Sequence, residues 1–162
     1  MHMVTGTTRP DAKIWRAAQQ FFEAGEILWA HENRDKCIYP LIMNYAFSCE
    51  LSLKATESLV KYSSVQYGIV LNPISSESCV TGHHLYSIFQ KLKQETRDEI
   101  EAEFLRLAEV DLIPLLRKFS TYFVDVRYSF EKTGGSYAIS DLRILAHGLL
   151  EAVRVWGGNQ GR

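Results

Sequence analysis

Glu50 and Lys54 are the first candidates for chemistry, because they place a carboxylate and an ammonium group four residues apart in an apolar segment. Side chains at this spacing lie on one face of a helix and can form an ion pair. A partly buried charge is costly unless it is paired, so the two groups pair, meet charges of another element or face a polar cleft. A solvated salt-bridge stripe is an equally good interpretation, because Glu57 and Lys61 repeat the spacing.

Two adjacent histidines, His83 and His84, follow Thr81 and Gly82 at an expected helix start. Histidine changes its charge near neutral pH and can act as an acid, a base or a ligand. Neighbouring residues on a helix point about 100° apart, so we expect at most one of the two to be functional. A metal site would need further ligands at helical spacing, which the sequence does not offer, and we expect no metal and no other cofactor.

Arg127 is the third candidate, because it lies among aromatic residues and Glu131 follows it one helical turn later. A guanidinium group forms two parallel hydrogen bonds with a carboxylate or a phosphate. Glu131 or Glu50 would be its partner in a structural network, and the phosphate of a ligand is the alternative. The sequence has no P-loop, dinucleotide-binding glycine motif, nucleophile elbow or H-E-x-x-H motif, which argues against a standard nucleotide hydrolase or metalloprotease.

Apolar residues at helical spacing predict the elements that position these groups. The expected helices are residues 11–30, residues 41–65, a short helix capped by Thr81, one opened by a capping-box pattern at 96–99, residues 111–130, and one from Ser140 to Trp156. Residues 66–80 are expected to form a loop, and no alternating run predicts a strand. The predicted fold class is all-α: an antiparallel up-and-down bundle of four main helices plus one or two short helices.

The composition is that of one globular domain, with 162 residues, 46% hydrophobic and 23% charged. We expect a single helical domain over residues 9–157, with flexible termini at 1–8 and 158–162. The net charge of -1 provides no overall attraction to nucleic acid or anionic lipid, so any polyanion site must be local. The sequence shows no signal peptide and no membrane-spanning segment, and its three cysteines are widely spaced, so we expect a cytoplasmic protein.

Three segments in order resemble bacterial HEPN-domain proteins: residues 44–54, residues 82–85 with Phe89 and Leu92, and Phe123 with Arg127, Tyr128 and Glu131. The resemblance implies a helical bundle, a homodimer, and membership of a family that includes nucleotide-binding domains, RNA-cleaving toxins of toxin–antitoxin systems and partners of small nucleotidyltransferases. The RNA-cleaving members carry an arginine that is followed within a few residues by a histidine. Here no histidine follows Arg127 before His147.

The main functional hypothesis is a HEPN-like module that binds a nucleotide or an RNA phosphate in a polar cleft lined by Glu50, Lys54, His83, Arg127 and Glu131. One alternative is a divergent metal-independent ribonuclease in which His83 replaces the missing base and Arg127 steadies the charged phosphate. The other is a non-catalytic structural or antitoxin-type partner, in which the same residues hold the bundle together.

Overall fold

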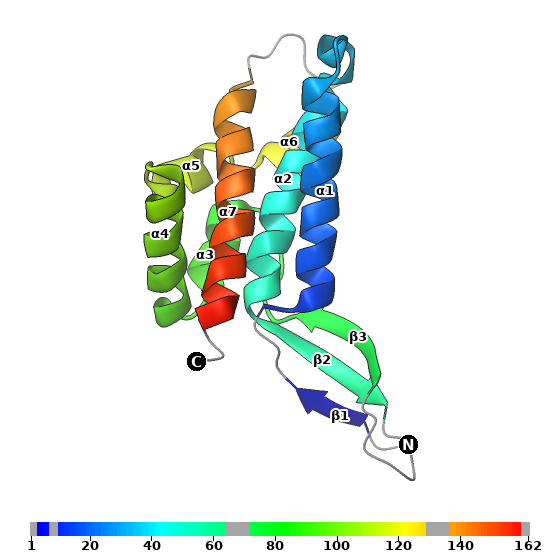
Figure 1. Cartoon of the computed structure of the whole chain (residues 1–162), viewed down its shortest axis with the longest axis vertical. Helices are drawn as coiled ribbons and strands as arrows, with labels where there is room; N and C mark the ends of the chain where they lie inside the picture. Colours follow the sequence, from blue (N-terminus) through cyan, green and yellow to red (C-terminus); the bar gives the residue numbers. More distant parts are fainter. Residues whose placement is uncertain (1–2, 7–9, 64–71, 129–136, 160–162) are drawn as a thin grey trace.

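The computed structural model describes residues 3–6, 10–63, 72–128 and 137–159, and it is mainly helical (Figure 1). The elements are β1 Met3–Gly6, α1 Ala12–Ala30, the 3-10 helix η1 Arg34–Cys37, α2 Ile38–Thr56, β2 Ser58–Ser63, β3 Asn72–Ser78, α3 Leu85–Lys91, α4 Gln94–Ala108, α5 Leu112–Lys118, α6 Tyr122–Arg127 and α7 Ile139–Asn159. The predicted helical fold class is therefore confirmed. None of the helices described is long and apolar enough to cross a membrane.

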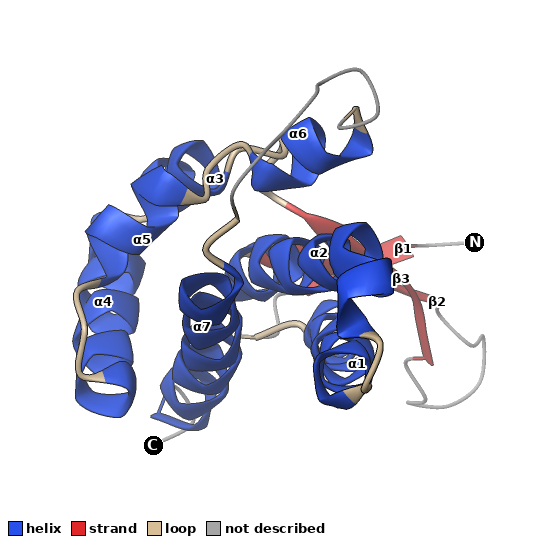
Figure 2. Cartoon of the chain, turned by 90° about the horizontal axis from the view of Figure 1, so that it is seen from above, coloured by secondary structure: helices blue, strands red, loops and turns tan. Residues whose placement is uncertain are grey.

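The long helices α1, α2, α4 and α7 lie side by side, in the spatial order α1, α2, α7, α4 (Figures 1 and 2). Helix α7 thus lies between α2 and α4, although α4 precedes it in the sequence. The short helices α3 and α6 pack against α2, which is enclosed by α1, α7, α3 and α6.

Helix α2 provides much of the core because it is apolar on most of its circumference. Leu41, Ile42, Tyr45, Cys49 and Leu53 are all at most 1% exposed. Burying a side chain of this size contributes roughly 1.5–3 kcal/mol each. One narrow stripe of α2 is partly exposed and includes Met43, Phe47, Leu51 and Lys54, and the buried Glu50 lies beside it.

The start of α1 is fixed by Asp11, as its position before the apolar stripe predicts. Its Oδ1 atom accepts hydrogen bonds from the backbone N–H groups of Lys13 and Ile14, at 2.9 and 3.0 Å. Its own N–H donates to the carbonyl of Ala55 near the end of α2, at 2.8 Å. Asp11 therefore caps one helix and joins it to the next.

Three stretches of the chain form strands that the sequence did not predict. They build an antiparallel sheet in the order β1-β2-β3, with Gly6 opposite Val60 and Ser58 opposite Ser78. Helix α2 therefore ends at Thr56, not near residue 65, and Glu57 and Lys61 are not a helical pair. Local pattern could not reveal these strands, because β2 obtains hydrogen-bonding partners from residues more than fifty positions away in the N-terminal segment. Residues 3–6, expected to be part of a flexible terminus, are one of the strands.

Several predicted helix starts were also wrong. His84, not Thr81, precedes α3, and Thr96 is buried inside α4, which begins at Gln94. The helix expected over 111–130 is two helices, α5 and α6, in the described residues up to 128. Ser120, between them, accepts hydrogen bonds from the backbone N–H groups of Leu85 and Tyr86 through its carbonyl and hydroxyl oxygens.

The last helix differs from its prediction at both ends. Ser140 lies within α7 rather than capping it, and the helix continues to Asn159, so Gly157 and Gly158 are helical. Pro10 lies so close to Gly157 that a Cβ atom there would overlap the proline ring. Glycine is therefore required at 157 by close packing.

We predict that Asp11→Ala lowers the free energy of unfolding by about 1–2 kcal/mol, because it removes the acceptor for two backbone N–H groups. Asp11→Asn is the matched control, since its carbonyl oxygen can still accept these bonds and most of the stability should remain. Urea unfolding followed by circular dichroism measures both. Equal losses in the two variants would contradict the capping role.

Candidate functional site

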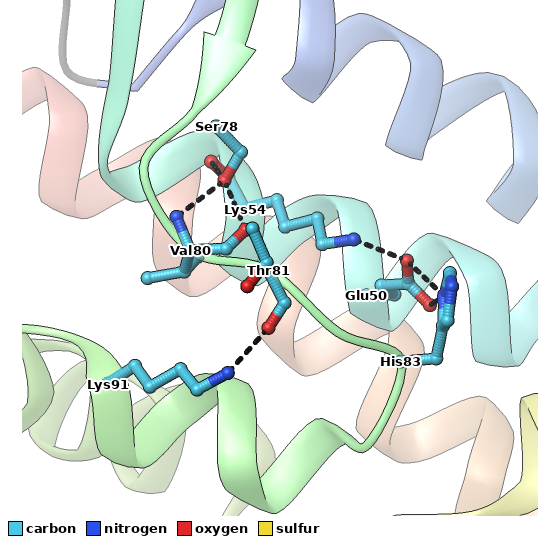
Figure 3. Close-up of polar contacts among 7 residues, drawn as sticks. All are labelled: Glu50, Lys54, Ser78, Val80, Thr81, His83 and Lys91. Carbon is cyan, nitrogen blue, oxygen red and sulfur yellow. Dashed lines mark hydrogen bonds and ion pairs between the residues drawn. The ribbon is translucent and has the colours of Figure 1, made fainter.

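Glu50 is the centre of the site and its side chain is only 1% exposed. The ammonium group of Lys54 lies 2.7 Å from Oε1, and the Nδ1 atom of His83 lies 3.1 Å from each carboxylate oxygen. Lys54 and His83 approach the carboxylate from opposite sides (Figure 3). A carboxylate group accepts hydrogen bonds, so in this pairing Nδ1 of His83 is the donor. Nε2 is then the basic nitrogen of the ring.

The loop that presents His83 is held at several points (Figure 3). The hydroxyl of Ser78 accepts from the N–H of Val80 and lies within hydrogen-bond distance of the carbonyls of Lys54 and Val80. Lys91 donates to the carbonyl of Thr81 at 2.8 Å. Gly82 then takes a φ of 110°, a conformation that favours glycine, and turns the chain toward Glu50.

Phe123 on α6 extends the site toward Arg127. The ring of His83 stacks on that of Phe123 with 5.5 Å between centroids, and Phe47 of α2 stacks on Phe123 at 5.1 Å. The guanidinium carbon of Arg127 lies 5.8 Å from the Phe123 ring and 5.7 Å from that of Tyr128. The side chains of Arg127 and His83 therefore share Phe123 as an aromatic neighbour, and both reach solvent.

The structure brings together Glu50, Lys54 and His83, and it places Arg127 next to them across Phe123. Glu131 lies outside the described residues. The interpretation of Glu50 and Lys54 as a solvated stripe was wrong, since Glu50 is buried and no second pair repeats the spacing. The expected pair of Arg127 with Glu50 is not formed, and within the described ranges no carboxylate forms an ion pair with Arg127.

Only one of the adjacent histidines, His83, contacts Glu50, and because both precede α3 the helical angle between them does not apply. His84 is exposed and precedes the first residue of α3. Phe123, named above only among the residues that carry the family resemblance, is buried. Its position one helical turn before Arg127 is the signal in the sequence that could have linked the two.

The chemistry of this cluster is that of an anion site with a built-in carboxylate. Lys54 and Arg127 carry two positive charges, against the single negative charge of Glu50. Glu50 is buried beneath them, Lys54 is 17% exposed and His83 is 52% exposed. Of the cations, Arg127 is exposed and has no ion-pair partner in the described part of the chain, so it is the one most available to a phosphate.

A second charged cluster, which the sequence did not predict, borders a cleft of about 610 Å³ between α1, α4 and α7. Arg143 donates to both carboxylate oxygens of Glu26, at 2.7 and 2.6 Å, and the hydroxyl of the buried Tyr45 donates to the same carboxylate at 2.6 Å. The hydrogen bonds from Arg143 hold the pKa of Glu26 below its usual value of 4.5, against the opposing effect of burial. Burial and the bond to Glu26 raise the pKa of Tyr45.

Among the described residues, no three His, Cys, Asp or Glu side chains are grouped so that they could hold a metal ion. Comparison of the chain with protein-family models, with curated proteins and with solved structures gave no match.

We predict that Glu26→Gln lowers the free energy of unfolding at pH 7 by roughly 1–2 kcal/mol, because a charge-assisted bidentate pair becomes a neutral one. The folded-state pKa of Glu26 is depressed, so its contribution is fully present above pH 4.5 and is lost as the pH falls through the folded-state value. The difference between wild type and variant, measured by urea unfolding from pH 7 to pH 3, should therefore shrink in acid.

Glu103→Gln is the control for this titration, because Glu103 forms only an exposed pair with Arg106 one turn away. It should change stability by less than about 1 kcal/mol at every pH. A Glu26→Gln deficit that stayed constant or grew in acid would contradict the assignment of the depressed pKa to this network.

Proposed function

We propose that the protein is a HEPN-like module that binds the phosphate of a nucleotide or of RNA at the surface formed by Lys54, His83 and Arg127. One observation carries the proposal: His83 and Arg127 reach solvent beside the same ring, that of Phe123. A phosphate placed there would receive hydrogen bonds from the guanidinium and from a protonated imidazole. Such charge-assisted bonds are shorter and stronger than neutral ones.

Glu50 has a supporting role in this proposal. Its buried carboxylate holds the histidine ring in one orientation and neutralises part of the positive charge before a ligand arrives. The ligand phosphate therefore meets groups that are already oriented, so less conformational entropy is lost when it binds. Lys54, which is tied to Glu50, contributes mainly through its charge.

The resemblance to HEPN-domain proteins also leads us to propose a homodimer and an interaction with a small nucleotidyltransferase. A toxin–antitoxin context belongs to the same proposal. These three statements rest on the resemblance and not on the contacts described above.

We predict that Arg127→Ala weakens the binding of a nucleoside monophosphate or a short RNA by at least about tenfold, the loss expected when one charge-assisted hydrogen-bonding group is removed. Isothermal titration at fixed salt measures the dissociation constants. Arg106→Ala is the matched control, since Arg106 is an exposed arginine paired with Glu103. No binding by the wild type, or equal binding by wild type and Arg127→Ala, would overturn the proposal.

A second function is favoured by the hydrogen bonds between Glu50 and His83. Because Glu50 engages Nδ1, the Nε2 atom is left to accept a proton, which is the requirement for a metal-independent ribonuclease. In that reaction Nε2 takes the proton of the 2′-hydroxyl, the 2′-oxygen attacks phosphorus, and the bond from phosphorus to the 5′-oxygen breaks. The 5′-oxygen takes a proton from solvent, and Arg127 stabilises the negative charge on the phosphoryl oxygens.

For the ribonuclease function we predict cleavage of single-stranded RNA in the presence of a metal chelator, with loss of at least about a hundredfold in rate in His83→Ala. A deoxy-substituted RNA that lacks the 2′-hydroxyl at the cleavage site should remain intact. Cleavage that is equally fast in His83→Ala and in the wild type would rule out this histidine as the base and point to a contaminating nuclease.

A further inference from the structure

Two segments, residues 83–86 and 117–123, form a seam that carries both His83 and a second cation–aromatic pair. Residues 83–86 and 117–123 run side by side in opposite directions, with the His83 ring on Phe123 at one end. In the middle, the backbone N–H of Tyr86 donates to the hydroxyl of Ser120 at 3.3 Å. At the other end, Arg117 donates to the hydroxyl of Tyr86 at 2.9 Å, and its guanidinium carbon lies 4.7 Å from the centre of that ring.

The two ends of the seam are alike in chemistry. Each has an exposed arginine over an aromatic ring: Arg127 over Phe123, and Arg117 over Tyr86. Within the described residues, no carboxylate forms an ion pair with Arg117. The bond to the Tyr86 hydroxyl orients the guanidinium but leaves other N–H donors free, since the group has five.

The spacing of the two pairs suits nucleotides two or three positions apart on one strand. His83 and Tyr86 are three residues apart, so their Cα atoms are separated by at most about 10 Å. Stacked nucleotides advance by about 3.4 Å each, so this distance corresponds to two or three nucleotides. Proteins that bind single strands combine aromatic surfaces on which bases stack with cations that follow the phosphates.

The surroundings of Tyr86 are open and polar. Tyr86 lines a shallow hollow of about 110 Å³ together with Gln90, whose amide offers both donors and acceptors to a base edge, and with Arg97, Asp98 and Glu101. The negative group nearest to the seam in sequence is Asp125, which accepts a hydrogen bond from Thr121 at 2.6 Å. Asp125 at one end and Asp98 and Glu101 at the other both oppose a polyanion, so the additional contacts depend on the Arg117 guanidinium.

We propose that Arg117 and Tyr86 form a second subsite, so that the protein binds a single-stranded polynucleotide and not only a mononucleotide. This inference rests on the proposed phosphate site at His83 and Arg127, which holds the first nucleotide. A phosphate two or three nucleotides along the strand contacts the Arg117 guanidinium, and a base stacks beside the Tyr86 ring. The chemistry is common to RNA and single-stranded DNA.

The test is the dependence of affinity on strand length, measured by titration with a nucleoside monophosphate and with tetranucleotides of RNA and of DNA. Wild type should bind the tetranucleotide at least about tenfold more tightly than the monophosphate, the gain expected from one added stack. In Arg117→Ala this gain should disappear, and the slope of log affinity against log salt should fall by about 0.7, the value for one phosphate contact in a single strand. Arg106→Ala should keep both the gain and the slope.

Arg117→Lys separates charge from stacking, because it keeps the positive charge and loses the planar group. It should keep the salt slope and lose part of the length gain. If the monophosphate binds through Arg127 but the tetranucleotide binds no better, or if Arg117→Ala keeps the gain, the second subsite is wrong and the first site stands. If neither ligand binds the wild type, the proposed function itself fails. A gain with RNA alone would show that the subsite recognises the ribose. An equal gain with DNA would show that it accepts single strands of either kind.

Discussion

The burial of the Glu50 carboxylate is the constraint on which the arrangement of the candidate site depends. Glu50 is only 1% exposed, on a helix that packs against α1, α7, α3 and α6, so its charge has little contact with water. Leaving such a charge without partners would cost several kcal/mol. Lys54 supplies one partner from the next turn of the same helix. The second partner must come from another element, and His83 can reach the carboxylate only because its loop crosses this part of α2.

The loop before α3 is therefore positioned by polar contacts as well as by packing. Ser78 and Lys91 hold its backbone at two points, and Gly82 provides the positive φ that the turn requires. Phe123 then covers the histidine ring from α6. The result is a half-exposed imidazole that is fixed on two sides, which is the kind of group that can bind or transfer a proton without a large loss of entropy.

A second carboxylate on the other side of the bundle, the partly exposed Glu26, is paired in a different way. Glu26 on α1 is matched by Arg143 on α7, and the hydroxyl of Tyr45 on α2 completes the carboxylate's contacts. This network joins three helices and has its charges balanced within the protein. The cluster at Glu50 has an excess of positive charge toward solvent, and that difference is why a ligand is proposed for the one and a stabilising role for the other.

The sequence by itself determined the helices whose signals are local. The apolar stripe and the Asp11 cap specify α1, and the all-round apolar surface of residues 41–53 specifies a central helix, because both depend on residues within a few turns. The same local spacing predicted that Glu50 and Lys54 face one another. The titratable side chain of His83 made it a candidate, but its partner was not predictable from spacing alone.

Tertiary structure alone decided the features that depend on residues far apart in the chain. The sheet needs residues 3–6 to pair with β2. The break between α5 and α6 accompanies the hydrogen bonds of Ser120 to α3. Helix α4 begins before the capping-box pattern at Thr96, where the Lys93 N–H donates a hydrogen bond to Glu57. Glu26 and Arg143 are 117 residues apart, so no spacing rule could pair them. The spacing of apolar residues in the sequence shows which side of an element is apolar. Which charged side chains meet depends on how the elements pack.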